Sequence, residues 1–405
     1  MAQAPIVNIT TKTNPTSFFI SCTYLRVYTE EAEYLHQTGD KSYFCGIKQL
    51  KKPVNGGYDM AEKRSEISQL GEFGLIDRIS SQVETGNKST LFGIGDDAAV
   101  IDGGEESILL CTDMLTEGVH FDLSYTPLQH LGYKAVVVNV SDIAAMNGRP
   151  EQIVVSLGLS NRFSVEAIDT LYEGIRAACK NYNVDLVGGD ITSSASGLVI
   201  SIAAIGKVKK DKVVYRSGAK ENDIVCVTGD LGGAFLGLQI LERDKQVFLV
   251  NPEMKPQLEN FEYMVGRQLK PEARTDIVYE LAELGIQPTS MIDISDGLAS
   301  ELLHISKNSG VGIKIFEDKI PIDTKVYETA AIELKIDPIT CALNGGEDYE
   351  LLFTINQTDF EKIKNHQDIH FIGHVHDNAN QNLLITKQGT PIPITAQGWN
   401  HFKKD

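Results

Sequence analysis

The order of apolar and polar positions along the first half of the chain predicts a mixture of strands and helices. Short apolar runs bounded by polar or glycine residues predict strands at 108–111, 153–157 and 198–205. A largely apolar segment that starts at Pro127 and stops before Gly148 predicts a long helix, because proline suits the first helical turn and glycine the end. Apolar side chains at helical spacing predict an amphipathic helix over 164–182. We expect one α+β domain here.

The same alternation starts again after the segment 216–219, which we interpret as a junction. An apolar run at 224–227 predicts a strand, and the glycine-rich segment 229–233 and a helical pattern follow it. The remaining elements are predicted as helix 274–284, strand 291–294, a helix that ends near 306, and strands 349–355 and 370–375. The second half is therefore expected to be α+β as well, and we place the two domains at 61–212 and 213–405.

Residues 1–60 differ from the rest of the chain. They are rich in Thr, Tyr and Lys, show no sustained hydrophobic period, and end in the turn-like sequence PVNGG at 53–57. A helical pattern begins only after Met60, over 61–70. We expect residues 1–60 to be a poorly ordered N-terminal extension, or the product of an upstream start codon.

Composition excludes several classes of protein. The chain has 405 residues, 42% of them hydrophobic, and a formal net charge of -18, which disfavours binding to nucleic acid or anionic lipid. The basic segment 207–212 is typical of a solvated turn. No apolar run reaches the roughly 18 residues of a membrane span. The six cysteines lack Cys-x-x-Cys spacing, so we expect neither a disulfide framework nor a zinc site, and a cytoplasmic location.

Aspartates recur where apolar strands end or inside apolar helices. A single aspartate of this kind is usually a cap or a turn residue. Capping does not explain Asp142, which lies inside a predicted helix, and unpaired carboxylates beside buried surface are costly. Convergence on Mg²⁺ explains the whole set, since carboxylate oxygens are its preferred ligands. The set is Asp96, Asp97, Asp113, Asp142, Asp190, Asp293 and Asp296.

Glycine-rich segments form the second pattern. The segment 229–233 precedes a predicted helix, whose free N–H groups would suit an anion, and Gly188-Gly189 and Gly345-Gly346 are further candidates for close approach by phosphate. Each signal alone is weak, because glycine-rich turns are common. The chain has no P-loop and no protein-kinase signature. Any ATP site must therefore belong to another fold.

Taken together, the motifs closely resemble those of the thiamine-monophosphate kinase family. They occur in this order: GEFGLI at 71–76, GIGDD at 93–97, TDMLTEGVHF at 112–121, NVSDIAAM at 139–146, GGD at 188–190, RSGA at 216–219, IDISDGL at 292–298 and GGEDYE at 345–350. The resemblance runs from about Gly71 to the C-terminus. The aspartates alone would suggest only the wider aminoimidazole ribonucleotide synthetase-like superfamily.

The resemblance implies a two-domain α+β (α/β), PurM-like fold in which an N-terminal sheet domain dimerises and a C-terminal α+β domain follows. It implies several Mg²⁺ ions held by Asp97, Thr112, Asp113, Asp142, Asp190, Asp293 and Asp296. It also implies ATP contacts from Tyr172, Gly189, Asp190, Arg216 and Ser295, and thiamine monophosphate contacts from His120, Glu347 and Trp399. Cys111 departs from the family, in which a hydroxyl residue often occupies this position.

The expected reaction is transfer of the γ-phosphoryl group of ATP to thiamine monophosphate, giving thiamine diphosphate. No catalytic general base is expected, because the second pKa of a phosphate monoester is near ~6 and the acceptor oxygen is already nucleophilic. Two alternatives remain open. One is a sister enzyme, such as a selenophosphate synthetase or a hydrogenase-maturation carbamoyl dehydratase, although the expected reactive cysteines are absent. The other is a module that binds Mg-ATP without turnover.

Overall fold

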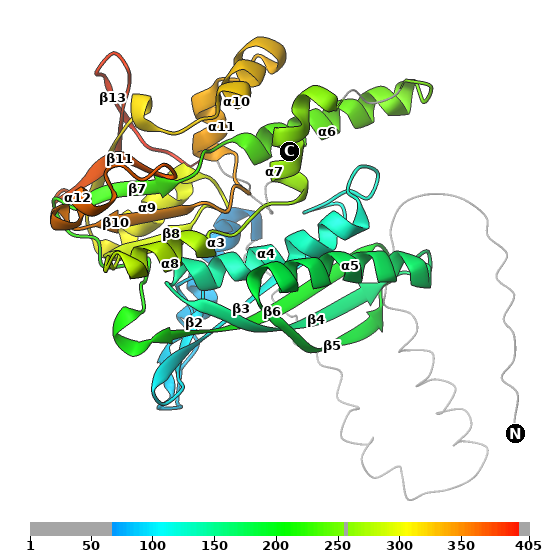
Figure 1. Ribbon diagram of the computed structural model, residues 1–405, viewed down its shortest axis with the longest axis horizontal. Coiled ribbons are helices and arrows are strands. Elements are labelled where there is room, and N and C mark those ends of the chain that lie inside the picture. Colours follow the sequence, from blue (N-terminus) through cyan, green and yellow to red (C-terminus); the bar gives the residue numbers. More distant parts are fainter. Residues whose placement is uncertain (1–66, 255–257, 397–405) are drawn as a thin grey trace, which may run out of the picture. The chain divides into compact units, whose positions relative to one another are not determined.

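The computed structural model describes residues 67–254 and 258–396. Within these residues the chain forms two β-sheets, one from each half of the sequence, with helices packed against them (Figure 1). The first sheet uses strands between Thr90 and Lys209 and the second uses strands between Ile224 and Pro393. The predicted domain boundary at 212/213 falls between the sheets, and the division into domains stays a prediction. Residues 1–60, the predicted extension, lie outside the described residues.

The first sheet has six strands in the spatial order β1-β2-β3-β6-β4-β5. Its neighbours pair antiparallel, except that β4 and β5 are parallel. The strands are β1 Thr90–Phe92, β2 Ala99–Asp102, β3 Glu106–Thr116, β4 Arg149–Leu159, β5 Asp185–Ser193 and β6 Leu198–Lys209.

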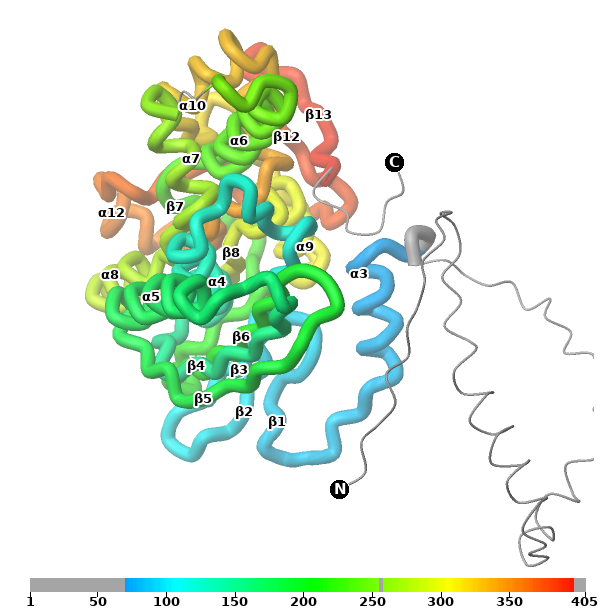
Figure 2. The backbone as a smooth tube through the Cα atoms, turned by 90° about the vertical axis from the view of Figure 1, so that its right-hand side faces the viewer, coloured from blue at the N-terminus to red at the C-terminus, as the bar shows by residue number. Residues whose placement is uncertain are grey.

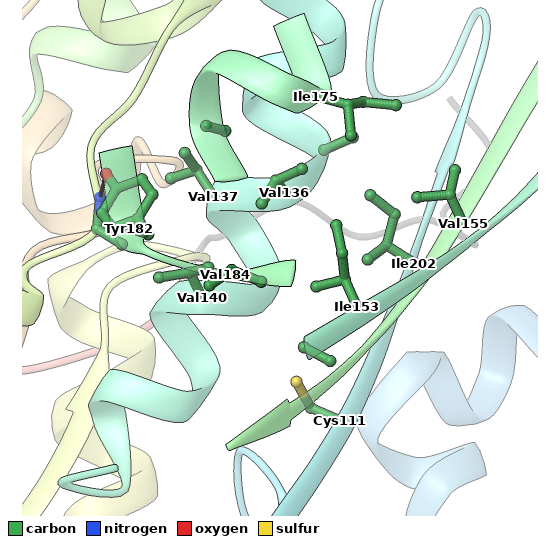
Figure 3. Packing of buried hydrophobic residues seen from close by; sticks show 14 of the residues in the cluster. Cys111, Val136, Val137, Val140, Ile153, Val155, Ile175, Tyr182, Val184 and Ile202 are labelled. Atoms are coloured by element: carbon green, nitrogen blue, oxygen red, sulfur yellow. Dashed lines mark hydrogen bonds between the residues drawn. The ribbon is translucent and has the colours of Figure 1, made fainter. Parts of the chain in front are cut away.

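Helices α4 (Leu128–Ala145) and α5 (Val165–Tyr182) lie over one face of this sheet (Figures 1 and 2). Valines of α4 and Ile175 of α5 meet Ile153, Val155 and Ile202 of the sheet in the core (Figure 3). The helices approach closely because glycines face each other. A Cβ atom on Gly132 would lie 2.0 Å from the carbonyl oxygen of Leu171.

The other face of the first sheet carries apolar side chains that remain exposed. Met114 of β3 is 58% exposed and Val154 of β4 is 39% exposed. Leu110 of β3 and Ile205 of β6, which pair with each other, are exposed as well. Alternation along a strand places successive side chains on opposite faces, so these residues form one apolar surface opposite the helices.

The second sheet has seven strands in the order β13-β12-β9-β11-β7-β10-β8. Its strands are β7 Ile224–Thr228, β8 Ser290–Asp293, β9 Gly312–Phe316, β10 Leu351–Ile355, β11 Ile369–His376, β12 Leu383–Ile385 and β13 Pro391–Pro393. The helices of the second half are α6 Gly233–Val250, α7 Glu262–Leu269, α8 Thr275–Glu283, α9 Leu298–Ser309, α10 Thr324–Glu328, α11 Pro338–Asn344 and α12 Phe360–Ile363. No helix in the described ranges has an apolar stretch that could cross a membrane.

Helix α4 contacts both sheets, and this position is what builds the candidate site. It packs on β3 and β6 of the first sheet and on β8 of the second (Figure 2). Its C-terminal Ala144 and Ala145 belong to a core that also contains Met291 and Phe353. A helix that is buried on most of its sides can therefore carry a polar residue only where that residue meets other polar groups.

One expectation about local structure is wrong, and one strand was not expected. Asp113 does not end a strand, because β3 stays paired with β6 as far as Thr116 opposite Val199. Strand β5, which the sequence pattern did not predict, contains Gly188, Gly189 and Asp190 and lies at the edge of the sheet. The predicted helix at 61–70 overlaps α3 (Ile67–Ser80), which is kinked at Gly71, where φ is 67°.

Candidate active site

Three carboxylates from distant parts of the sequence converge beside α4. They belong to Asp97 in the β1–β2 loop, Asp142 on α4 and Asp293 at the end of β8. One oxygen atom from each lies within 4.8 Å of the others. The sequence predicted that its aspartates would meet in space, and for these three the structure shows that they do.

Local contacts fix the direction of two of these side chains, Asp293 and Asp97. The hydroxyl group of Ser141 donates a hydrogen bond of 2.6 Å to Asp293 Oδ2. Arg216 donates from Nε to Asp97 Oδ1 at 3.2 Å, and its backbone N–H contacts the carboxylate of Asp96 at 3.1 Å. Because the partners are on other elements, the carboxylates are held before any ligand binds.

Asp113 lies beside the group of three. Its backbone N–H donates to Asn139 Oδ1 of α4 at 3.2 Å, which ties β3 to the helix. Cys111, two residues earlier, faces the same helix, and its Sγ lies 3.5 Å from the carbonyl oxygen of Asn139. The thiol therefore points toward the side of the sheet on which Asp113 and Asp142 meet.

Burial and mutual repulsion make these carboxylates harder to ionise. Burial, followed by the charges of Asp113, Asp293 and Asp97, raises the pKa of Asp142 well above its ordinary value. Burial and then Asp97 raise the pKa of Asp293 to about 7. Burial and then Asp97 also raise the pKa of Asp96 to about 7. The site thus concentrates negative charge that a bound cation would neutralise.

The residues fit a hard divalent cation such as Mg²⁺. Asp97 Oδ2 and Asp113 Oδ2 are buried and have no hydrogen-bond partner among the described residues. Buried polar atoms without a partner are uncommon and call for a ligand. The donors are carboxylate oxygens, which suit Mg²⁺ better than zinc or copper.

Two other predicted metal ligands on the first sheet are placed away from the group. The side chain of Thr112 is exposed, on the sheet face opposite Asp113, and its hydroxyl donates to the carbonyl oxygen of Ile202 at 3.0 Å. Asp190 lies on β5, three strands from β3, at a separation on the order of 14 Å. The structure therefore does not bring either side chain to the three carboxylates within one chain.

Asp190 instead belongs to a second group of predicted residues. Tyr172 of α5 and Gly189 and Asp190 of β5 line one surface depression of about 550 Å³. Gly189 packs tightly there, since an added Cβ would lie 1.9 Å from the carbonyl oxygen of Val155. The three predicted ATP contacts Tyr172, Gly189 and Asp190 are thus brought together at the sheet edge.

Ser295 and Asp296 lie in the turn between β8 and α9, separated from Asp293 by Ile294. Both donate their backbone N–H groups to Glu301 Oε1, at 3.2 and 2.8 Å. Ser295 is exposed and Asp296 is half-buried. Asp296 is not one of the three carboxylates that converge, although it lies in the turn beside them.

The predicted substrate residues have different surroundings. Glu347 lies in the loop before β10, in the left-handed region with φ 58°. Its carboxylate receives Lys134 Nζ at 2.9 Å and Gln268 Nε2 at 2.6 Å. His120 lies in the turn after β3, and its Nδ1 accepts from the backbone N–H of Thr116 at 3.0 Å. Trp399 lies outside the described residues.

The glycine-rich segment before α6 does not offer its N–H groups to an outside anion. The carboxylate of Asp348 accepts from the backbone N–H groups of Gly232 at 2.8 Å and Ala234 at 3.3 Å. The anion that the sequence suggested for this helix end is therefore a side chain of the protein itself.

Comparison with known proteins identifies the family. Residues 95–208 match the family model described as AIR synthase related protein, N-terminal domain. Thiamine-monophosphate kinase of Bacillus subtilis is 36% identical over 345 residues, covering 82% of this chain and 100% of the relative. The Aquifex aeolicus thiamine-monophosphate kinase is 35% identical over 337 residues, covering 83% and 99%. This chain belongs to the thiamine-monophosphate kinase family.

Solved structures agree with this membership. AaThiL complexed with AMPPCP and TMP has a TM-score of 0.72 and 34% identity, and the match covers 84% of this chain and 100% of that one. The hydrogenase maturation protein HypE in complex with ATP has a TM-score of 0.58 at 17% identity, over 78% and 92% of the chains, which shows a shared fold alone. The predicted α+β, PurM-like fold is confirmed.

Sequence reasoning missed residues that support the site in this member of the thiamine-monophosphate kinase family. Lys134 is buried on α4 and pairs with Glu347, and Asn139 on the same helix contacts Asp113. A lysine within an apolar helical segment was a usable signal, because a buried lysine needs a partner. Gln268, which also holds Glu347, gave no such signal.

Proposed function

We propose that this chain transfers the γ-phosphoryl group of ATP to the phosphate of thiamine monophosphate, the last step in the synthesis of thiamine diphosphate. The observation that carries the proposal is the convergence of Asp97, Asp142 and Asp293 within 4.8 Å, in a chain of the thiamine-monophosphate kinase family. The similarity to AaThiL complexed with AMPPCP and TMP supports both substrates.

In the proposed reaction an oxygen of the thiamine monophosphate phosphate attacks the γ-phosphorus of ATP. A bond forms from that oxygen to the γ-phosphorus, the bond from the γ-phosphorus to the bridging oxygen breaks, and ADP leaves. The acceptor phosphate is largely a dianion at neutral pH, since its second pKa is near ~6. The chain therefore needs to supply alignment and charge neutralisation rather than a general base.

We propose that Asp97, Asp142 and Asp293 hold divalent cations, with Asp113 beside them. Bound Mg²⁺ would offset the repulsion between the two anionic substrates. Arg216 adds a positive charge at this point and fixes Asp97, while Ser141 fixes Asp293. We also propose further metal contacts from Asp296, Asp190 and Thr112. Of these, Asp190 and Thr112 lie on parts of the first sheet away from the three carboxylates.

The proposed substrate contacts form separate groups. The depression lined by Tyr172, Gly189 and Asp190 offers an aromatic ring and exposed backbone for ATP, and Arg216 and Ser295 are proposed to contact it near the carboxylates. Glu347, held by Lys134 and Gln268, is proposed to bind the cationic thiamine end. His120 and Trp399 are proposed as further thiamine monophosphate contacts.

We also propose that two copies pair through the first sheet and that the protein works in the cytoplasm. The exposed apolar face that includes Met114 and Val154 supports the dimer, because apolar patches of this kind are typical of protein interfaces. The four described cysteines are free, which fits a reducing compartment. Size-exclusion chromatography with light scattering tests the dimer, and a monomer at micromolar concentration would contradict it.

Release of ADP tests the function. The purified chain is incubated with ATP and Mg²⁺, with and without thiamine monophosphate, and with thiamine or selenide as alternative acceptors. We expect ADP release that requires thiamine monophosphate. Release driven by another acceptor would favour a sister enzyme, and binding of ATP without release under any condition would favour a module without turnover.

A further inference from the structure

Glu301 is a buried carboxylate one turn inside α9. Only 2% of the residue is exposed. Its Oε1 accepts the backbone N–H of Asp296 at 2.8 Å and that of Ser295 at 3.2 Å. Its Oε2 is also buried and has no hydrogen-bond partner among the described residues. One carboxylate oxygen of Glu301 therefore accepts hydrogen bonds from the turn that follows β8.

This turn is held from a second side by the loop before β10. The backbone N–H of Glu347 donates to the carbonyl oxygen of Ser295 at 2.7 Å, and that of Tyr349 donates to Ile294 at 2.9 Å. Gly297 ends the turn with φ 113°, a conformation that favours glycine. The backbone between Asp293 and α9 is thus fixed by the β10 loop on one side and by Glu301 on the other.

Packing alone does not account for a carboxylate at this position. An apolar side chain of similar volume would fill the same space without burying a polar atom that lacks a partner. It would also leave the backbone N–H groups of Ser295 and Asp296 without this acceptor, and a donor that loses its partner is costly. Glu301 is not among the carboxylates that converge, so it does not act as a ligand in that group.

We infer that Glu301 is a positioning residue for the proposed divalent-cation site, acting through the backbone N–H groups of Ser295 and Asp296 to direct the carboxylates of Asp293 and Asp296. The inference rests on the cation site within the proposed function. Groups that orient metal ligands in this way are worth roughly 10- to 100-fold in metal affinity.

Mn²⁺ binding without substrates tests the inference, measured by electron paramagnetic resonance on the full chain. We expect Glu301→Ala to weaken Mn²⁺ binding by at least about tenfold. Glu301→Gln should stay within about threefold of wild type, because its amide oxygen still accepts both N–H groups. Asp323→Ala is the matched control, since Asp323 accepts the N–H groups of Lys325 and Val326 at the start of α10. The control should bind Mn²⁺ as wild type does.

Two results would overturn the inference. One is wild-type Mn²⁺ affinity in Glu301→Ala, and the other is equal weakening in Glu301→Gln and Glu301→Ala. If Glu301→Ala does not fold, Glu301→Asp decides, because its shorter side chain cannot reach both N–H groups: weaker binding supports the inference and unchanged binding overturns it. A wild type that phosphorylates thiamine monophosphate but shows no Mn²⁺ binding overturns the inference alone. Weakened binding in a protein without kinase activity leaves the inference standing and removes the proposed function.

Discussion

Lys134 of α4 and Glu347 of the loop before β10 form an ion pair of 2.9 Å, although the side chain of Lys134 is only 3% exposed. The pair joins the helix that carries Asp142 to the loop proposed to bind thiamine. The Glu347 carboxylate is also contacted by Gln268 Nε2. Removing the ammonium group of Lys134 should therefore leave Gln268 as the side chain that holds Glu347.

We therefore predict that Lys134→Met raises the KM for thiamine monophosphate by about tenfold and leaves the KM for ATP within about threefold. Steady-state kinetics with each substrate varied in turn measures both. Lys364→Met is the control, because Lys364 forms an exposed pair with Glu361 on α12. An equal rise in both KM values would show that the pair does not act on the thiamine side alone.

Asp142 and Asp113 should matter for turnover more than for acceptor binding. Replacing either by Asn removes a negative charge from the proposed cation site while keeping its size. We expect kcat to fall by at least roughly 100-fold, with little change in the affinity for thiamine monophosphate measured by calorimetry. Asp169→Asn, an exposed position on α5, should keep full activity. Full activity in both Asp142→Asn and Asp113→Asn would count against their metal roles.

The substitution Asp142→Asn should stabilise the folded protein when no divalent cation is present. Ionised Asp142 lies beside the carboxylates of Asp113, Asp293 and Asp97, so neutralising it relieves repulsion. We predict that Asp142→Asn unfolds a few degrees above wild type in EDTA, on the order of 2–4 °C. Added Mg²⁺ should raise the unfolding temperature of wild type more than that of the variant. A lower unfolding temperature for the variant in EDTA would contradict this view of the site.

Glu350 should be important for stability rather than for the cation site. It is buried and accepts from Arg267 Nη1 at 2.9 Å, Arg274 Nη1 at 2.8 Å and the hydroxyl of Thr228 at 2.6 Å. Glu350→Ala would remove a buried carboxylate partner from both guanidinium groups, and breaking a buried pair costs about 3–5 kcal/mol. Urea unfolding measures the loss. Glu361→Ala is the control, because it breaks an exposed pair and should change the free energy of unfolding by less than about 1 kcal/mol. Similar losses in the two variants would contradict a large contribution of the Glu350 pairs to stability.

Local sequence patterns predicted most of the helices and strands, but not every strand. Pro127 and the apolar segment after it were enough to predict α4, because capping and periodicity are local properties. Strand β5 was not predicted, because the glycines at 188 and 189 are not typical of a strand interior. Here Gly189 instead allows β5 to pack against the backbone of Val155. Close backbone approach depends on a partner strand that the sequence alone does not locate.

The sequence also predicted part of the candidate site, namely which aspartates belong to it. The family motifs pointed to Asp97, Asp142 and Asp293, and the structure brings them together. Nothing local revealed that Asp190 lies on another strand edge, that Asp348 occupies the helix end at Gly232, or that Lys134 reaches Glu347. Each of these relationships joins segments far apart in the chain, and tertiary packing decides them.

The central claim is that the chain passes the terminal phosphoryl group of ATP directly to thiamine monophosphate at the site of the three carboxylates. Mass spectrometry of the products formed from ATP labelled with ¹⁸O in its γ-phosphoryl group, with thiamine monophosphate and Mg²⁺, tests this most directly. The account predicts thiamine diphosphate that carries the label in its terminal phosphate, at a far lower rate from Asp142→Asn. Unlabelled thiamine diphosphate, no thiamine diphosphate at all, or the wild-type rate from Asp142→Asn would contradict it.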